Sequence, residues 1–250
     1  MKKAIKAVSL LLALVTVFTL AACGSKDSKK VITMATNAEF KPFEYMEGDK
    51  IVGADIDFAN AIAEYMGCKL EVTNIDFDAA LTGASTGKYD MAVAGITAND
   101  ERRKNMNFSD DYYKASQAII VTADSDIKAA EDLEGKVVSC QEGTTGEGYL
   151  QDNGYQVQSF KTGSEAVAAL VAGKADAVVI DNAVAKALSQ EQGGKTKVLD
   201  EALTEETYAI ATKLGNDEFT SKLNEAIKAL KDNGKLAEIF KKYDLPYDAE

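Results

Sequence analysis

The apolar and polar positions of this chain alternate between short strand-like runs and stretches with helical spacing. The predicted elements of the first half are a strand at 31–36, a helix at 55–66, a strand at 70–75, a helix at 79–86 and a strand at 89–94. The helices show apolar residues at the 3.6-residue period, and the strands are short apolar runs bounded by turn residues. Regular alternation of strand and helix predicts an α/β layer architecture.

The same pattern recurs in the second half of the chain. The turn GKYD at 87–90 and the turn GKAD at 173–176 each lead from a helical pattern into an apolar run. Upstream, the strand-like run at 136–140 and its polar loop mirror the first strand and the loop that follows it. Chance is the alternative, because short connections from helix to strand resemble one another in composition. We interpret the repetition as two similar α/β lobes.

The ends of the predicted strands carry the candidate binding chemistry, because ligands of open α/β sheets bind beyond the carboxyl ends of the strands. These ends lie at 37–40, 95–97, 141–145 and 181. The segment 143–146 opens a predicted helix, whose free N–H groups can hold an anion. Asp181 offers the opposite charge, which suits an ammonium group. Together with the nearby Phe40 and Phe77, the two sites predict a zwitterionic ligand.

Arg102 follows the buried run 91–94 and lies in the first turn of a helix that Asn99 or Asp100 caps. A cation is unfavourable there, because the helix N-terminus already carries partial positive charge. We therefore expect an anionic partner. Taken alone, such an arginine most often pairs with a neighbouring acid such as Asp100 or Glu101. When Arg102 is considered together with the strand ends of both halves, the carboxylate of a ligand becomes its favoured partner.

The amino-acid composition argues against several classes of function. The 250 residues are 46% hydrophobic, which is enough to bury one large core or two modest ones, and the net charge of −12 disfavours nucleic acid as a partner. The chain has no histidine and no CxxC pair among its three cysteines, so histidine catalysis and common metal sites are unsupported. We expect no cofactor and no metal. Cys68 and Cys140 are expected to be buried thiols, with a disulfide as the alternative.

The first 22 residues have the order of a signal peptide. A basic start precedes an apolar run at 7–20 that is too short to span a bilayer comfortably. The sequence LAAC at 20–23 resembles the lipobox of bacterial lipoproteins. That resemblance implies removal of 1–22, diacylglyceryl and palmitate modification of Cys23, and anchorage at the extracellular face of the cytoplasmic membrane. Residues 23–30 would be a short tether, and an ordinary secretion signal is the alternative.

Several stretches together resemble the extracellular solute-binding proteins, family 3, of polar amino-acid ABC transporters. They are 35–44, 53–57, 94–97 with 101–102, 108–113, 143–145 and 176–181. The resemblance implies a two-lobed, periplasmic-binding-protein-like fold of type II, with the ligand cleft between the lobes and two hinge strands. We place lobe 1 at 31–115 and 213–250, lobe 2 at 119–208, and the hinge at 116–118 and 209–212.

Carried over by position, the resemblance assigns contacts to an α-amino acid. The expected ligand-binding residues are Asn37, Phe40, Phe77, Gly95, Thr97, Arg102, Gln141, Thr144, Thr145 and Asp181. Arg102 would grip the α-carboxylate, helped by the Thr97 N–H and Thr145. Asp181 would hold the α-ammonium together with the Gly95 carbonyl and the Thr97 hydroxyl.

The ligand side chain would lie between Phe40 and Phe77, although packing in the core is an alternative role for Phe40. The family often has aspartate at position 37, where this chain has Asn37, and the change weakens without excluding a cationic ligand. Gln141 and Glu142 are further sources of polarity at the pocket.

The resemblance implies a binding protein rather than an enzyme. It would capture an L-α-amino acid, expected to be polar, by lobe closure and deliver it to the permease and ATPase subunits of an ABC importer, and we expect a monomer. One alternative is a small-acid dehydratase on the same fold, which would need a general acid or base in a cleft without histidine. The other is the ligand-sensing domain of a receptor, against which the lipobox and the lack of a signalling domain argue.

Overall fold

The computed structural model describes residues 30–247. The predicted signal peptide, Cys23 and all of the tether but its last residue lie outside the described residues. Within residues 30–247, no helix has both the length and the apolar character that crossing a bilayer requires.

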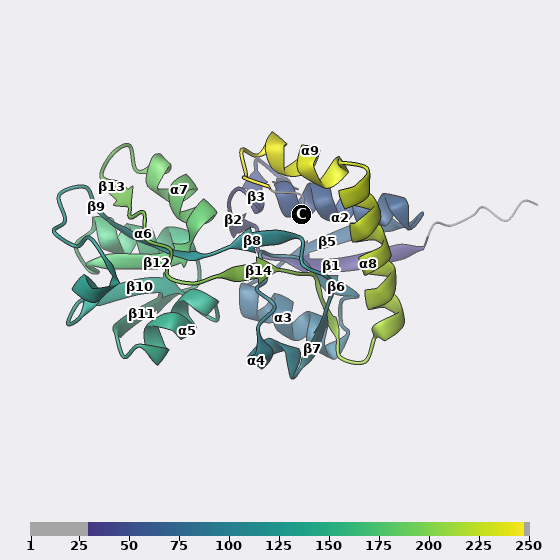
Figure 1. Cartoon of the computed structure of the whole chain (residues 1–250), viewed down its shortest axis with the longest axis horizontal. Coiled ribbons are helices and arrows are strands. Elements are labelled where there is room, and N and C mark those ends of the chain that lie inside the picture. The colour runs from purple at the N-terminus through teal and green to yellow at the C-terminus, as the bar shows by residue number, and fades with distance from the viewer. Residues whose placement is uncertain (1–29, 248–250) are drawn as a thin grey trace, which may run out of the picture. The chain divides into compact units, whose positions relative to one another are not determined.

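The first sheet has five strands in the order β5–β1–β6–β15–β7 (Figure 1). Their bounds are Lys69–Asn74 for β5, Val31–Thr36 for β1, Met91–Ala92 for β6, Ala211–Lys213 for β15 and Met106–Phe108 for β7. β1 pairs in parallel with β5 and β6, and β15 is antiparallel to both of its neighbours. The carboxyl ends of β1 and β6 therefore open at the same edge of the sheet.

Helices cover both faces of the first sheet, as alternation along β1 requires. They are α2 (Ala54–Tyr65), α3 (Phe77–Thr86), α8 (Asp217–Asp232) and α9 (Lys235–Lys242). Met34 packs in one cluster with Phe58 of α2, whereas its neighbour Ala35 packs in another with Ala80 of α3. Successive side chains of a strand point to opposite faces, so α2 and α3 lie on opposite sides of the sheet.

The second sheet repeats this plan in the order β11–β10–β12–β9–β13. Its strands are β11 (Gln156–Phe160), β10 (Val137–Gln141), β12 (Ala177–Asp181), β9 (Gln117–Thr122) and β13 (Thr196–Val198), with the helices α5 (Thr145–Asp152), α6 (Gly163–Val171) and α7 (Asn182–Glu191). β10 is parallel to β11 and β12. The predicted repetition of two α/β lobes is confirmed.

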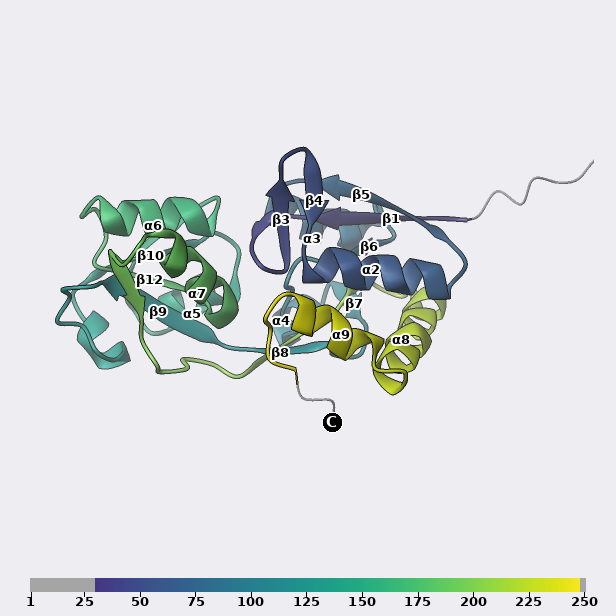
Figure 2. The same ribbon diagram turned by 90° about the horizontal axis from the view of Figure 1, so that it is seen from above.

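A two-stranded antiparallel ribbon joins the two sheets (Figure 2). The chain leaves the first sheet through β8 (Tyr113–Ala115) and returns through β14 (Glu206–Tyr208). Of the residues expected in the hinge, 117–118 belong to β9 and 211–212 belong to β15. The paired ribbon therefore lies a few residues earlier in the sequence, at both crossings, than the expected hinge.

The segment after β1 is more ordered than predicted. We expected a loop after the first strand, but β2 (Glu39–Phe40), β3 (Glu44–Glu47) and β4 (Lys50–Val52) form a small antiparallel sheet there. Pro42 lies in the turn between β2 and β3, where its missing N–H costs no ladder hydrogen bond. The pairing sets Phe40 directly opposite Glu44, so both side chains lie on one face of this sheet.

Both described cysteines are free thiols. Cys140 is buried, and burial raises the pKa of its thiol to about 11. Cys68 is only half-buried, so the expectation of burial is wrong for it. It follows the last turn of α2, where the helix end leaves one side of the residue open to solvent.

Candidate functional site

One cavity is lined by residues of both lobes. The lining residues are Asn37, Phe40, Glu44, Phe77, Ala94, Gly95, Thr97, Arg102, Gln141, Thr144, Thr145 and Asp181. All ten residues predicted from the sequence are among them, and the structure adds Glu44 and Ala94. They meet here because strands of each sheet end at the edge that faces the other lobe.

The guanidinium of Arg102 lies at this cavity and contacts both lobes. Its Nη1 donates to the carbonyl of Thr97 at 2.9 Å, and its Nη2 donates to the carbonyl of Gly143 at 3.0 Å. The guanidinium carbon lies 5.4 Å from the centre of the Phe77 ring, a distance at which a cation and a ring attract each other. These contacts fix the plane of the guanidinium.

The backbone at Arg102 follows the sequence prediction. Asn99 is the residue that caps α4 (Asp100–Arg103), because its side chain accepts from the Arg102 N–H at 2.9 Å. The neighbouring acid Glu101 pairs with Lys104 and leaves the Arg102 side chain directed at the cavity. Burial lowers the pKa of Arg102, and the charges of nearby acids oppose that shift.

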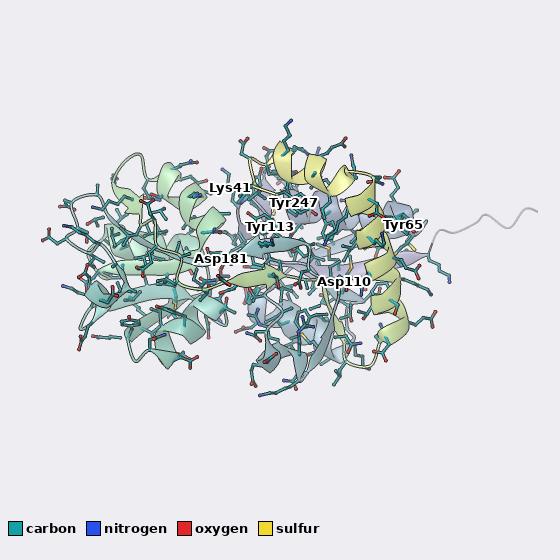
Figure 3. All side chains as sticks on the ribbon, in the orientation of Figure 1. Lys41, Tyr65, Asp110, Tyr113, Asp181 and Tyr247 are labelled. Carbon is teal, nitrogen blue, oxygen red and sulfur yellow. The ribbon has the colours of Figure 1, made fainter. Side chains whose placement is uncertain are left out.

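Asp181 ends β12 and lies near the connecting ribbon (Figure 3). Only 4% of its surface is exposed. Its Oδ1 accepts from the hydroxyl of Tyr208, and its Oδ2 accepts from Nε2 of Gln117 at 3.0 Å. Burial, reinforced by the charge of Glu206, raises the pKa of Asp181 to about 7, while these two hydrogen bonds pull it down. A carboxylate has about four acceptor sites, so Asp181 can take a further donor.

Glu206, at the start of β14, was not predicted, although it organises two predicted residues. Its Oε2 accepts from the hydroxyl of Thr97 at 2.5 Å and from that of Thr145 at 2.8 Å, and its Oε1 accepts from Thr204 at 2.8 Å. Thr97 and Thr145 belong to different lobes, so Glu206 links the lobes. Because a hydroxyl has one hydrogen, the Thr97 oxygen remains available only as an acceptor.

Thr144 and Thr145 begin α5 in the way that the sequence predicted. The Thr144 hydroxyl caps the helix by accepting from the Glu147 N–H at 3.3 Å. The first N–H groups of a helix lack partners within the helix, and they carry partial positive charge. The hydroxyl of Thr145 already donates to Glu206, so the donor that Thr145 can offer to an anion is its backbone N–H.

Gly95 must be glycine, because the Phe40 ring packs against it. A Cβ at this position would lie 2.7 Å from the Phe40 Cε1, and its φ of +54° suits glycine. The Gly95 N–H donates to Oδ2 of Asp55 at 2.9 Å, and the Tyr112 hydroxyl donates to the same oxygen at 2.8 Å. Asp55 is fully buried, and burial raises its pKa to about 6 against the effect of these bonds.

Asn37 and Gln141 connect the two lobes at the cavity. Gln141 Nε2 donates to Asn37 Oδ1 at 3.1 Å, and Asn37 Nδ2 donates to the Ile75 carbonyl at 3.1 Å. Both polar atoms of the Asn37 amide are therefore engaged with the protein. The buried Oε1 of Gln141 accepts from no donor in the described part of the chain.

Glu44 is the second lining residue with chemistry that the sequence prediction missed. It is fully buried, and within residues 30–247 no N–H or hydroxyl group donates to its carboxylate oxygens, whose hydrogen-bonding neighbour is the carboxyl group of Asp55. Burial and then the charge of Asp55 raise the pKa of Glu44 well above its usual range. Glu44 reaches the cavity because the pairing of β2 with β3 places it beside Phe40. We expected a loop in this segment, so the sequence analysis did not predict that pairing.

Comparison with known proteins assigns this chain to a family. The profile of the bacterial extracellular solute-binding proteins, family 3, matches residues 32–246. The arginine-binding extracellular protein ArtP of Bacillus subtilis (strain 168) is 34% identical over 244 residues, covering 94% of this chain and 96% of that protein. The glutamine-binding protein GlnH of an ABC transporter in the same strain is 30% identical over 259 residues, covering 93% and 94%.

A solved structure agrees with these relatives. An ancestral arginine-binding protein bound to arginine is 39% identical and has a TM-score of 0.82, covering 86% of this chain and 99% of that one. The predicted α/β fold with two lobes is confirmed, as is the expectation of a binding protein rather than an enzyme. The chain belongs to the bacterial extracellular solute-binding proteins, family 3.

Proposed function

We propose that this protein captures a free α-amino acid outside the cell and delivers it to the permease of an ABC importer, whose ATPase subunits power transport. The observation that carries the proposal is a guanidinium and a carboxylate, Arg102 and Asp181, that come from different lobes and line one cavity. Relatives named for binding arginine and glutamine support an amino acid as the ligand.

Arg102 is assigned the ligand α-carboxylate. A guanidinium has five N–H donors, and the carbonyls of Thr97 and Gly143 take two of them. The remaining donors can pair with a carboxylate, and the N–H of Thr145 adds a second positive element from the other lobe. The carboxylate would therefore be held from both sides of the cleft.

Asp181 is assigned the ligand α-ammonium, with the Thr97 hydroxyl oxygen and the Gly95 carbonyl as further acceptors. Three acceptors match the three N–H groups of an ammonium. Hydrogen bonds to charged groups contribute about 1.5–3 kcal/mol each, and a micromolar dissociation constant requires about 8 kcal/mol. The two charged ends with aromatic contact can supply that energy after the cost of association.

Lobe opening is part of the proposal, because the proposed contacts are buried. Asp181, Phe40 and Gln141 are between 2% and 6% exposed, so a ligand reaches them only when the lobes separate. We place the hinge in the ribbon of 113–115 and 206–208, since it is the paired connection between the two sheets. A ligand that contacts both lobes favours the closed form.

We also propose that the protein is a monomer held at the extracellular face of the cytoplasmic membrane by lipid on Cys23, after removal of residues 1–22. The support is the order of basic residues, apolar run and lipobox in the sequence. Two acyl chains anchor a protein far more stably than one. A Cys23→Ser variant is expected in the medium of the producing cells rather than in their membranes.

A thermal-shift screen of the twenty common amino acids tests the proposed function. At least one is expected to raise the melting temperature, because a ligand that binds only the folded protein stabilises it. The same compound without its carboxylate or without its α-amino group should give little shift. No shift with any of the twenty would contradict the proposal.

A further inference from the structure

Asp55 is a fully buried acid that lies behind the wall of the cavity. It belongs to the first turn of α2 and is not among the residues that line the cavity. Taking a carboxylate out of water is costly, so a buried one needs a cation or several hydrogen-bond donors. Within residues 30–247 no lysine or arginine acts on Asp55. The donors that compensate it therefore indicate what it does.

Two donors converge on one oxygen of Asp55. Its Oδ2 accepts from the Gly95 N–H at 2.9 Å and from the Tyr112 hydroxyl at 2.8 Å. The neighbouring acid is Glu44 of β3, and burial raises the pKa of Glu44 well above its usual range. Glu44 therefore keeps its proton at pH 7, and the negative charge of the two acids lies on Asp55.

The bond from Gly95 to Asp55 fixes the turn that follows β6. Gly95 has φ of +54°, and its N–H is directed at Asp55 rather than at a neighbouring strand. Glycine has no Cβ to restrict its rotation, so a hydrogen bond of this kind sets the orientation of the turn. Within residues 30–247 no N–H or hydroxyl group donates to the Gly95 carbonyl, which leaves that oxygen open to a ligand.

Tyr112 connects Asp55 to the ribbon between the lobes. The centre of its ring lies 4.6 Å from that of Phe58, so the ring is held in the core of lobe 1. Its N–H donates to the carbonyl of Tyr208 at 2.9 Å, and the Tyr208 hydroxyl donates to Asp181. A continuous series of hydrogen bonds thus joins two acceptors, one in each lobe, that the proposed function assigns to the ligand α-ammonium.

We infer that Asp55 and Tyr112 are positioning residues for the ligand α-ammonium: the Asp55 carboxylate, held by the Tyr112 hydroxyl, orients the Gly95 turn so that its carbonyl accepts from the ammonium. The inference rests on the proposed function, which assigns that carbonyl to the ammonium. Because every α-amino acid carries this group, loss of the positioning should weaken all of them alike.

Tyr112→Phe tests the role of the hydroxyl, because the ring and its packing are retained. Calorimetric titration with arginine, glutamine and any other amino acid that stabilises the wild type should show affinity about tenfold lower for each one that binds. Tyr113→Phe is the matched control. Tyr113 is adjacent and only 4% exposed, but its hydroxyl makes no hydrogen bond within residues 30–247, so affinity should stay within about twofold of the wild type.

The amide proton of Gly95 reports on the positioning directly. Its chemical shift in an NMR spectrum of the full chain should follow the ionisation of Asp55, whose pKa burial raises to about 6. The titratable groups that act on Asp55 are Tyr112 and Glu44, and burial keeps both protonated in this range by raising the pKa of each. Asp55, Gly95 and Tyr112 all belong to lobe 1, so lobe closure does not affect the measurement.

The same spectra separate positioning from a purely structural role. In Tyr112→Phe the midpoint for the Gly95 amide should move to higher pH, because the lost hydrogen bond lowers the pKa of Asp55. In Tyr113→Phe the midpoint should stay where it is in the wild type. A general loss of stability would lower the melting temperature without moving this midpoint.

A Gly95 amide of the wild type that does not titrate between pH 5 and pH 7 overturns the inference, and this measurement does not depend on whether a variant folds. Equal affinities of Tyr112→Phe and Tyr113→Phe also overturn it, as does a tenfold loss for one amino acid beside none for another. In each case the proposed capture of an amino acid stands. If no amino acid binds the wild type and the thermal-shift screen is also negative, the proposed function fails and the inference fails with it.

Discussion

The two charged groups that we assign to the ends of the ligand are held in place by the protein's own hydrogen bonds. Arg102 is fixed by the carbonyls of Thr97 and Gly143, and Asp181 by Tyr208 and Gln117. Groups that are already oriented lose little conformational entropy when a ligand binds, and the contact strengthens accordingly. This orientation supports the proposal that Arg102 and Asp181 bind the two charged ends of a ligand.

At the residue scale, replacing Asp181 with asparagine removes one negative charge at almost constant shape. The ligand α-ammonium then loses its ionic partner, and we expect affinity for any amino acid to fall about 100-fold at pH 8. The loss should shrink below pH 7, because the wild-type carboxyl is itself protonated there.

The matched control for this change is Asp176→Asn, in the turn before β12. The exposed side chain of Asp176 accepts from the Val137 N–H and does not line the cavity. The amide oxygen of asparagine can accept the same hydrogen bond. Calorimetric titration of both variants with the amino acid ligand, at pH 8 and below pH 7, measures these changes in affinity. Wild-type affinity in Asp181→Asn at pH 8 would remove Asp181 from the site.

The sequence predicted the residues whose types are unusual for their positions, and it missed those whose role depends on distant partners. Arg102 at a helix start and Asp181 at a strand end each carry a local anomaly that can be recognised without a structure. Glu206 is 109 residues from Thr97 and 61 from Thr145, and nothing near it in the chain indicates that it joins them. Glu44 was missed because its importance arises from pairing with Asp55 in the folded core.

At the scale of elements, the cavity depends on close contact between the start of α5 and the start of α3. Gly143, just before α5, has φ of +74°, and a Cβ there would lie 1.9 Å from Oδ1 of Asp78 in α3. These two elements belong to different lobes. The contact at Gly143 therefore exists only when the lobes are together.

Gly143→Ala should weaken ligand binding by about tenfold or more, because the added methyl group opposes lobe closure and the ligand must offset that cost. Gly154→Ala is the control, since Gly154 also has φ of +74° but has open space where the Cβ would be. Both changes strain the backbone of lobe 2 alike, so their melting temperatures should fall alike. Equal affinities of the two variants for the ligand would contradict closure at this contact.

The elements themselves were largely predictable, and the exceptions have a common cause. The strands and helices of both lobes follow from apolar periodicity, which depends on neighbouring residues. The sheet β2–β4 and the position of the ribbon were not predicted. Both depend on the pairing of short segments whose partners the local pattern does not identify, such as β8 with β14, about 90 residues apart.

At the scale of the whole molecule, the buried acids of the cavity link folding to pH. The pKa values in the folded protein are about 7 for Asp181 and about 6 for Asp55, whereas a free aspartate titrates near 4. Between about pH 4 and pH 7 the unfolded chain loses protons that the folded protein keeps. The free energy of unfolding without ligand therefore decreases as pH rises through this range and levels off above it.

We expect the melting temperature without amino acid to fall by several degrees between pH 4.5 and pH 7.5. The net charge of −12 acts in the same direction, so a control is needed. Asp181→Asn removes one titrating group and should make the fall less steep. A melting temperature of the wild type that rises steadily over this interval would contradict the assignment of raised pKa values to these acids.

The most direct test of the account is a calorimetric titration of Arg102→Ala beside Arg103→Ala, with the amino acid that stabilises the wild type most. The two arginines are adjacent in α4, but Arg103 is exposed and stacks on Phe108, away from the cavity. We predict that Arg102→Ala loses at least about 100-fold in affinity and that Arg103→Ala stays within about twofold of the wild type. Wild-type affinity in Arg102→Ala would contradict the assignment of the ligand carboxylate to Arg102 and with it the proposed binding site.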